Sequence, residues 1–223
     1  MGIFERRIRE RRQRRHQIME AAELVFQEQG FTNATLVEIA DNAEVSPGTI
    51  YLYFKNKEDI FLSLILCMFD ELITQLDYTN DFDSFLPLEE RIEIICACLI
   101  NAYEKNPKLM KYALNRQGDE KIQMSDKMTS SFTKQLHRVV NTIAIHFSHH
   151  EKMNNGTIAP FAISKFIWVQ FTGTVLVNDP LNAMSQYKLA SSFEEFSFWI
   201  KKVVLLHLHD GLFLDSVINH SAF

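Results

Sequence analysis

Apolar residues recur at spacings of three and four along most of the chain, which is the pattern of helices with a buried face. No stretch shows the sustained alternation of apolar and polar residues that is typical of a strand, and Asn155-Gly156 lies between helical patterns rather than in a hairpin. The pattern therefore predicts an all-α protein of about nine helices. The breaks between them fall at residues 77–85, Asn106-Pro107, Gly118-Asp119, Asn154-Asn155-Gly156 and Pro180.

The spacing also predicts where individual helices begin and end. After an arm of uncertain order, a first helix is expected over residues 9–29, with Gly30 as its left-handed stop. A helix beginning at Asn56 carries apolar residues over a wide arc, as expected for a helix that contacts two parts of the protein. The later helices are expected over residues 84–105, 106–115, 120–150, 158–178 and 192–208.

The stretch over residues 35–57 carries the most specific local signals. Thr35 and Glu38 have the spacing of a capping box, in which each side chain bonds the backbone N–H of the other residue. Ser46 followed by Pro47 begins another helix, because serine is a good N-cap and proline is tolerated at the first helical position. Two short helices joined by a tight turn form a helix-turn-helix.

The second of these short helices has two different sides. Ile50 and Phe54 are four residues apart and are expected to pack against the preceding helix. Gly48, Thr49 and Leu52 fall on the opposite side and are expected to stay free. A short helix with a small tip and a polar free side is suited to the major groove of DNA.

Linked positions over roughly the first quarter of the chain resemble the TetR family of one-component transcriptional regulators. The resembling positions are Ile18, Ala21, Ala22, Phe26, Gly30, Phe31, Thr35, Glu38, Ile39, Ala40, Val45 to Tyr51, Tyr53, Phe54, Asn56 and Lys57. The chain departs from the family pattern at Glu44, where glycine is usual because the turn favours a positive φ. It departs again at Leu52, which can contact a thymine methyl group but cannot donate a hydrogen bond to a base.

The resemblance implies a DNA-binding head over residues 1–57 and an effector-binding and dimerisation body over residues 58–223. In such a protein, a homodimer places two recognition helices in successive major grooves of a palindromic operator in double-stranded DNA. Gly48 and Thr49 are then expected near base edges. The full set expected at the DNA is Arg11, Arg12, Thr35, Ser46, Pro47, Gly48, Thr49, Tyr51, Leu52, Tyr53 and Lys57.

The distribution of charge supports nucleic-acid binding at one end of the chain. The 223 residues have a net charge of −5, but residues 1–15 hold seven arginines and two glutamates, a local charge of +5. The remainder therefore sums to −10. A basic arm beside a helix-turn-helix is expected to contact phosphates or to enter the minor groove; a solvated charged extension is the alternative.

The body is rich in aromatic residues, with fourteen of the 18 phenylalanines beyond residue 58. Three destinations compete for them: a plain core, a dimer interface formed by helices over 158–178 and 192–208 as is typical of the family, and a ligand cavity. The cavity lining expected is Phe61, Ile65, Met68, Cys96, Leu99, Met110, Phe166 and Phe171. Such a lining suits a hydrophobic or amphipathic small molecule, for example a fatty-acyl compound.

Metal binding finds little support in the sequence. Cys67, Cys96 and Cys98 show no CxxC spacing and are interpreted as reduced core thiols of a cytoplasmic protein. His146, with the His149-His150-Glu151 run, has a spacing that could bind a metal. This cluster closes a predicted helix, where imidazole suits the negative end of the dipole, so it is interpreted as a solvated helix end.

Catalysis and membrane insertion are not expected either. The chain has no HExxH motif, no recognisable nucleophile with a neighbouring base, and no glycine-rich phosphate loop, so neither an enzyme nor a cofactor is predicted. No apolar run is long enough for a membrane span, and the arginine-rich start is unlike a secretion signal. The prediction is a ligand-responsive regulator, a repressor that a hydrophobic effector releases. An activator of the same fold and a helical adaptor with a vestigial head remain alternatives.

Overall fold

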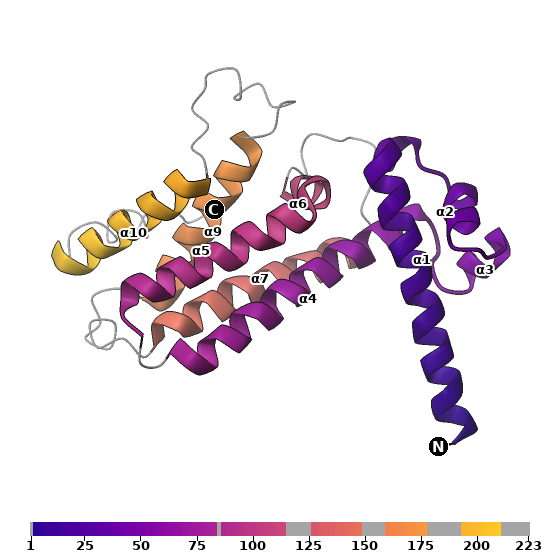
Figure 1. The fold of residues 1–223 in the computed structure, drawn as a ribbon, viewed down its shortest axis with the longest axis horizontal. Helices are drawn as coiled ribbons and strands as arrows, with labels where there is room; N and C mark the ends of the chain where they lie inside the picture. Colours follow the sequence, from indigo (N-terminus) through magenta and orange to yellow (C-terminus); the bar gives the residue numbers. More distant parts are fainter. Residues whose placement is uncertain (1, 84–85, 115–125, 149–158, 178–192, 211–223) are drawn as a thin grey trace. The chain divides into compact units, whose positions relative to one another are not determined.

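The computed structural model describes residues 2–83, 86–114, 126–148, 159–177 and 193–210. Every regular element within these ranges is an α-helix, which confirms the predicted all-α fold (Figure 1). The helices are α1 (Ile3–Asn33), α2 (Leu36–Asn42), α3 (Pro47–Tyr51), α4 (Lys57–Asp83), α5 (Leu88–Lys105), α6 (Pro107–Leu114), α7 (Asp126–Ser148), α9 (Pro160–Val177) and α10 (Phe193–Asp210).

The chain divides into two compact units. One comprises Met1–Cys67 and Gln117–Phe132, and the other comprises Met68–Arg116 and Thr133–Phe223. The first unit therefore includes about three turns of α4, a helix that continues without interruption into the second unit. We call the first unit the head and the second the body. A division of function after residue 57 stays a prediction.

The N-terminal arm is helical, which corrects the expectation of an arm of uncertain order. Helix α1 begins at Ile3, where the backbone N–H of Gly2 donates to Glu5 Oε2 at 3.3 Å. Arg6 Nε donates to Glu10 Oε1 at 2.8 Å, an i,i+4 pair that supports this first part of the helix. At the other end, Gly30 interrupts the helix, as predicted, with a positive φ of 79° and a ψ of 162°, and one further turn follows to Asn33.

The head has an aromatic core. Phe26, Phe31 and Phe61 are each at most 7% exposed. Their ring centroids lie 5.6 Å apart for Phe26–Phe31 and for Phe26–Phe61, and 4.8 Å apart for Phe31–Phe61. Ile50 and Phe54 are also buried, so the side of α3 that was predicted to face inward does so. Phe61 thus belongs to the core of the head, which corrects its assignment to a ligand cavity of the body.

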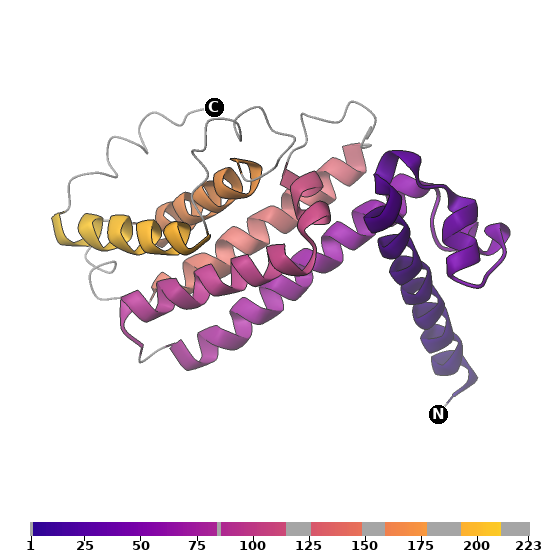
Figure 2. The same ribbon diagram turned by 45° about the horizontal axis from the view of Figure 1, so that its top comes forward.

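The body is formed by the second part of α4 together with α5, α6, α9, α10 and most of α7 (Figure 2). Within it, α10 packs against both α5 and α9, and α6 packs against α5 and α9. Helix α5 begins at Leu88 rather than at residue 84. Pro87 is its extended N-cap residue, and a proline disfavours the helical conformation in the residue before it, so the helix begins only after Pro87. Helices α6, α9 and α10 begin within two residues of their predicted starts. For α7, the predicted start at residue 120 lies outside the described residues.

Buried polar groups join three helices of the body. Arg91 of α5 is 6% exposed; its Nε donates to the backbone oxygen of Leu86 at 3.0 Å and its Nη1 to that of His146 at 2.9 Å. The His146 ring is completely buried, and its Nε2 lies 3.0 Å from the backbone oxygen of Leu76 in α4. Because a carbonyl oxygen only accepts, Nε2 carries the proton. His146 is therefore a packed residue, not part of a solvated helix end as predicted.

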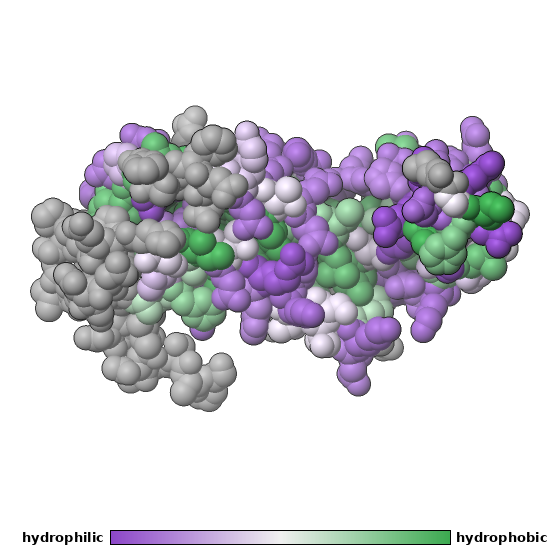
Figure 3. Space-filling view, turned by 90° about the horizontal axis from the view of Figure 1, so that it is seen from below, coloured by the Kyte–Doolittle hydropathy of each residue, from purple (hydrophilic) through white to green (hydrophobic). Residues whose placement is uncertain are grey.

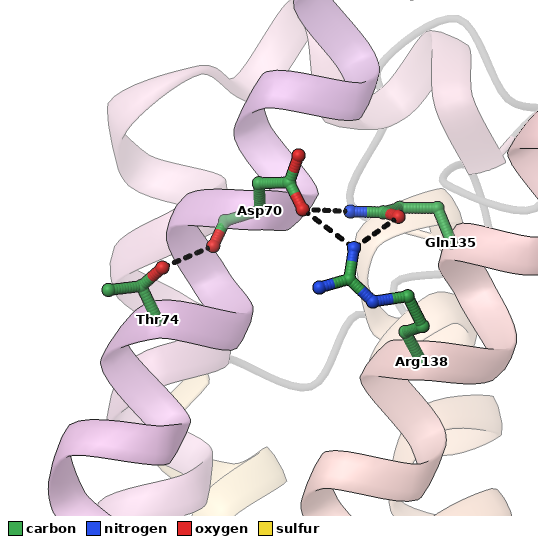
Figure 4. A network of polar contacts seen from close by, with 4 residues as sticks. All are labelled: Asp70, Thr74, Gln135 and Arg138. Carbon is green, nitrogen blue, oxygen red and sulfur yellow. Dashed lines mark hydrogen bonds and ion pairs between the residues drawn. The ribbon is translucent and has the colours of Figure 1, made fainter.

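A second polar network links α4 to α7 (Figure 4). Asp70 Oδ1 accepts from Gln135 Nε2 at 2.6 Å and from Arg138 Nη1 at 2.8 Å, and Arg138 Nη1 also lies 2.9 Å from Gln135 Oε1. The Asp70 and Arg138 side chains are about half exposed, at 57% and 50%, so the ion pair itself contributes about 1 kcal/mol or less. The more important partner is Gln135, which is only 7% exposed and whose amide needs this acceptor.

The three cysteines have different surroundings. Cys96 is buried on α5, and this burial raises the pKa of its thiol to about 12 despite a hydrogen bond with Ser197 of α10. Cys98 is half-buried and Cys67 is exposed, so the interpretation of all three as core thiols is wrong for Cys67. Near Cys96, Lys201 of α10 pairs with Glu93 of α5 and ties the same two helices together.

The sequence predicts neither a metal site nor a membrane span, and the structure can be searched for both only over the described residues. Among the described residues, no three His, Cys, Asp or Glu side chains are grouped as metal ligands would be. The predicted partners of His146 in such a group, residues 149–151, lie outside the described ranges. None of the helices traced in the structure has the length and apolar character that crossing a membrane requires.

Candidate functional site

The predicted capping box opens α2. The Thr35 hydroxyl accepts from the Glu38 backbone N–H at 3.2 Å and donates to Glu38 Oε2 at 2.7 Å. The same carboxylate oxygen accepts from the Thr35 backbone N–H at 2.9 Å. The Thr35 side-chain hydrogen bond, followed by the backbone one, lowers the pKa of Glu38. Its charged form therefore supports the start of α2, where the helix dipole also favours negative charge.

The turn between α2 and α3 has the positive φ that was expected at Glu44. Glu44 adopts a φ of 51°, a left-handed conformation that glycine reaches more easily. The Val45 backbone N–H donates to the backbone oxygen of Ala40 at 3.0 Å, and that of Glu44 to Asp41 at 3.1 Å. These bonds close the turn and set the direction in which α3 leaves it, so a glutamate is tolerated in the position that usually takes glycine.

The serine cap of α3 is also confirmed. Ser46 Oγ accepts from the Thr49 backbone N–H at 3.2 Å, and the two side-chain hydroxyl oxygens lie 2.9 Å apart. Pro47 occupies the first helical position. Thr49 is half-buried by this contact, so its hydroxyl already has a partner when no DNA is present. Any bond from Thr49 to a base has to share or replace the contact with Ser46.

The outward side of α3 is exposed at Gly48 and Leu52, as predicted, whereas Thr49, which was also predicted to stay free, is half-buried. Leu52 is 71% exposed and Tyr51 is 60% exposed, while Gly48 lies at the exposed tip. A Cβ atom placed on Gly48 would meet only Ser46 Oγ, at 3.8 Å. Packing within the head therefore does not require glycine here, and the missing side chain leaves a flat tip that another molecule can approach closely.

Two arginines of α1 lie beside the end of α3. The guanidinium carbon of Arg11 is 5.9 Å from the ring centroid of Tyr53, and that of Arg15 is 4.9 Å from the ring centroid of Phe54. Arg15 also donates to Ser63 Oγ at 2.8 Å. Of the two arginines expected at the DNA, Arg11 is thus brought to the recognition helix. Arg12 is exposed and lies one position further round α1, beside Arg9 and His16.

Lys57 has a structural role that sequence reasoning missed. Its ammonium group donates to the backbone oxygens of Phe31 at 2.6 Å, Ala34 at 2.8 Å and Thr32 at 3.3 Å, and lies 4.6 Å from the centre of the Phe31 ring. These carbonyls end α1, where a cation is favourable. The predicted phosphate contact by Lys57 would require it to give up part of this arrangement.

The residues predicted to line an effector cavity divide between the two units, with Phe61 and Ile65 in the head and the others in the body. Ile65, Met68, Cys96, Leu99, Met110 and Phe171 are each at most 6% exposed. Phe166 is half-buried and lines a cavity of about 170 Å³ between α9 and α10. The other lining residues are Gln170, Thr174, Phe196, Trp199, Ile200 and Val203, which sequence reasoning did not propose as a cavity. This volume is below the roughly 300 Å³ at which pockets for drug-sized ligands begin.

Helices α9 and α10 also expose large apolar side chains. Phe161 and Val169 of α9 are 39% and 63% exposed, and Phe198 and Trp199 of α10 are 54% and 53% exposed. The two α10 rings contact each other edge to face, with centroids 5.6 Å apart. Single exposed apolar residues are normal, but a pair of contacting exposed rings on α10, which packs against α9, is a feature of interaction surfaces.

A family model matches part of the head, whereas the likeness to solved structures covers most of the chain. Residues 18–64 match the family model of bacterial regulatory proteins, tetR family. The HTH-type transcriptional regulator HbdR of Aromatoleum sp. (strain CIB) is 53% identical over 53 residues, 23% of either chain. The fatty acid metabolism regulator protein of Bacillus subtilis (strain 168) is 40% identical over 88 residues, 40% of this chain and 44% of that one. The chain thus matches less than half the length of these relatives.

Solved structures extend the likeness to the rest of the fold. FadR from Bacillus halodurans, a fatty acid degradation regulator, superposes with a TM-score of 0.64 at 19% identity, covering 89% of this chain and 96% of that one. FadR from Bacillus subtilis in complex with stearoyl-CoA superposes with a TM-score of 0.63 at 19% identity, covering 88% and 98%. At this identity the likeness shows a shared fold, with the same order of an N-terminal helix-turn-helix and a helical body.

Proposed function

We propose that this protein, a TetR-family regulator by its head and its fold, binds a palindromic operator as a homodimer and represses transcription until a hydrophobic effector releases it. The observation that carries the proposal is the head itself. Its match to the family model covers α2, the turn and α3, and α3 presents an open outer side on a capped helix that is packed from behind. Such a helix is the reading element of a helix-turn-helix.

In the proposed complex, the tip of α3 enters the major groove. Gly48 lets the backbone approach the base edges, Thr49 reads a base through its hydroxyl, and Leu52 contacts an apolar group such as a thymine methyl. Phosphates are held by the residues around this tip. They are Thr35, Ser46, Tyr51 and Tyr53, with Pro47 shaping the tip and Arg11 beside Tyr53. Phosphate contacts position the head, whereas only the groove contacts select a sequence.

Two substitutions on α3 test the assignment of roles. With a duplex selected from a random pool as the probe, Thr49→Ala is expected to reduce discrimination at one base-pair position by roughly 1–3 kcal/mol. Tyr51→Phe removes one hydroxyl and is expected to weaken binding to all duplexes about equally. Fluorescence anisotropy against the selected duplex and its single-base variants measures both effects.

The two variants are each other's control, because both change an outward residue of the same short helix. If both weaken every duplex to the same degree, Thr49 does not read a base. If the unchanged protein shows no preference for any sequence at moderate salt, the repressor proposal is wrong and a helical adaptor with a vestigial head is favoured.

Dimerisation is proposed to use α9 and α10. Their exposed apolar residues, Phe161, Val169, Phe198 and Trp199, lie on helices that also pack against each other. A twofold axis through this surface would bring each set against its own copy. The two heads would then reach two half-sites of one operator, which a single head reading only a few base pairs cannot do.

The effector is proposed to be a fatty-acyl compound or a similar amphipathic molecule bound in the body. Two observations support this class: the buried aliphatic and aromatic residues of α5, α6 and α9, and the likeness of fold to a FadR that was solved with stearoyl-CoA. The relative that shares 40% identity over 88 residues is likewise named for fatty acid metabolism. Because that match covers only 40% of this chain, the experiment must decide the ligand.

The effector class can be tested with a panel of compounds. Long-chain acyl-CoAs, free fatty acids and lipophilic drugs are added to the protein–operator complex at about 10 µM, a concentration that nearly saturates a site with a Kd of about 1 µM. At least one is expected to lower operator binding at least tenfold, measured by fluorescence anisotropy. If none does so and a polar metabolite does, the proposed ligand class is wrong.

Helix α4 is the proposed connection between effector and DNA, because it is continuous from the head into the body. In the body, Asp70 holds α4 to Gln135 and Arg138 of α7, and the Leu76 backbone oxygen holds it to His146 (Figure 4). An effector that changes the packing of α7 would therefore also change the tilt of α4. A different tilt alters the spacing of the two recognition helices, so that they no longer fit one operator.

A further inference from the structure

Helix α1 is longer than the core of the head requires. Residues 3–16 are all exposed, and the first completely buried side chain is that of Ile18. At 1.5 Å per residue, the exposed part of the helix is about 20 Å long. In two views its N-terminal end projects past α2 and α3 within the head (Figures 1 and 2). This exposed part of α1 is not needed to bury the core of the head, so its surface is available to bind another molecule.

One face of this projection continues the buried face of α1. Ile18, Ala22 and Val25 are buried and follow the spacing of three and four residues. The same spacing, continued toward the N-terminus, leads to Arg15, Arg11, Ile8, Arg7 and Phe4. The contacts of Arg15 with Phe54 and of Arg11 with Tyr53 agree with this placement. The face therefore points to the side of α1 on which α3 ends.

Between Arg11, which lies over the Tyr53 ring, and the N-terminus, this face of α1 is exposed to solvent. Phe4 is 74% exposed and Ile8 is 38% exposed, and the neighbouring Ile3 is 77% exposed. Arg7 lies between them along the helix. Figure 3 looks onto this end of the molecule, where hydrophobic and strongly hydrophilic residues lie next to each other on the head. Such a mixture of arginine and apolar side chains matches a duplex, whose grooves offer phosphates together with sugar and base edges.

We propose that the α1 face formed by Phe4, Arg7, Ile8 and Arg11 is a second DNA-contact surface, which grips the phosphate backbone next to the site read by α3. The surface is sequence-independent: Arg7 and Arg11 pair with phosphates, while Phe4 and Ile8 lie against sugars in the groove between them. The position of Arg11 on Tyr53 carries the argument, because it fixes the face to the end of the recognition helix. The proposal rests on the proposed function, since it takes DNA as the partner.

The opposite side of the same helix provides a matched control. Arg6 and Arg9 lie on that side, and Arg6 is paired with Glu10 at 2.8 Å. The double variants Arg7→Gln/Arg11→Gln and Arg6→Gln/Arg9→Gln remove the same charge from the same part of α1. They are compared with the unchanged full chain on two duplexes of equal length and composition, one selected from a random pool and one with a scrambled sequence.

The quantity to measure is the dependence of binding on NaCl concentration, followed by fluorescence anisotropy. The plot of log affinity against log salt is expected to lose about two units of slope in Arg7→Gln/Arg11→Gln, because about 0.9 of a counterion is released for each phosphate contact. This loss should be the same on both duplexes and leave their affinity ratio unchanged. Arg6→Gln/Arg9→Gln is expected to lose less than half as much.

Equal slopes for the two double variants would overturn the proposal, because the arginines would then act only through net charge. A second overturning result would be that Arg7→Gln/Arg11→Gln binds DNA normally but fails to bind vesicles of phosphatidylglycerol and phosphatidylcholine that the unchanged chain binds. The surface would then recognise lipid.

If the unchanged chain does not distinguish the two duplexes, the operator proposal fails, whereas a difference in slope between the variants still supports the α1 surface.

Discussion

Phe61→Ala is expected to lower the free energy of unfolding of the head by about 3–5 kcal/mol and to abolish operator binding. Phe61 is 3% exposed, and its ring contacts those of Phe26 and Phe31, so truncation leaves a cavity among three aromatic residues. Both tryptophans lie in the body helices α9 and α10. Tryptophan fluorescence therefore follows the body, and far-ultraviolet circular dichroism during urea unfolding should show an earlier, separate loss of helix from the head.

Phe166→Ala is the matched control for this experiment. It removes a ring of the same size from the half-buried wall of the α9–α10 cavity and is expected to leave the unfolding of the head unchanged. If Phe61→Ala instead kept normal operator binding and only changed the response to an effector, Phe61 would line a ligand cavity, as the sequence pattern suggested. The structural assignment to the head would then be wrong.

Trp199→Glu is expected to weaken dimerisation by about 4 kcal/mol or more, which is roughly a thousandfold. Trp199 is 53% exposed on α10 and contacts Phe198, and both rings belong to the apolar surface proposed for the dimer. Twofold symmetry places each substitution in the interface twice. Burying two carboxylates there is strongly unfavourable, and the Lys202 ammonium group, 5.4 Å from the centre of the Trp199 ring, offsets only part of that cost. Sedimentation equilibrium of the full chain at several concentrations measures the dissociation constant.

Leu24→Glu is the control for the dimer, since Leu24 is a similarly exposed apolar residue, at 55%, but lies on α1 in the head. It is expected to leave the dissociation constant unchanged. Circular dichroism of both variants must match that of the unchanged protein, so that a loss of dimer is not a loss of fold. A Trp199→Glu protein that stays dimeric at nanomolar concentration would contradict the use of α10.

The helix-turn-helix was predictable because its determinants are local. The capping bonds of Thr35 with Glu38 and of Ser46 with Thr49 each span three residues, and the fit of Pro47 at the first position of α3 depends on the backbone alone. The positive φ at Glu44 was implied by the resemblance to the TetR family, which usually has glycine at this position of the turn. Interactions of this range depend on the sequence in one short window, so spacing rules recover them.

Contacts between distant parts of the chain were not predictable in the same way. Lys57 bonds the carbonyls that end α1, more than 20 residues earlier, and His146 bonds the backbone of Leu76, which is 70 residues away. A lysine beside a helix-turn-helix has the same local pattern whether it meets phosphate or carbonyl. A histidine near a helix end has the same pattern whether water or another helix covers it.

The residues of α4 show this limit most clearly. Phe61 and Cys67 both belong to one continuous apolar pattern, and the pattern correctly predicted a helix with a wide buried arc. It did not separate Phe61, which packs in the head, from Met68, with which the body begins. It also did not show that Cys67 is exposed. Which partner a helical residue meets depends on the helices packed around it, and that information is absent from its own periodicity.

The sequence by itself determined the helical class, the helix-turn-helix with its caps, the open outer side of α3 and the basic character of the first residues. Each of these follows from backbone propensity, short-range hydrogen bonds or charge, which act over a few residues. Only the tertiary structure decided that the basic arm is a helix aligned with the end of α3, that Lys57 closes α1, and that Phe61 belongs to the head. These depend on which surfaces the folded chain brings together, and that is settled by packing across long stretches of sequence.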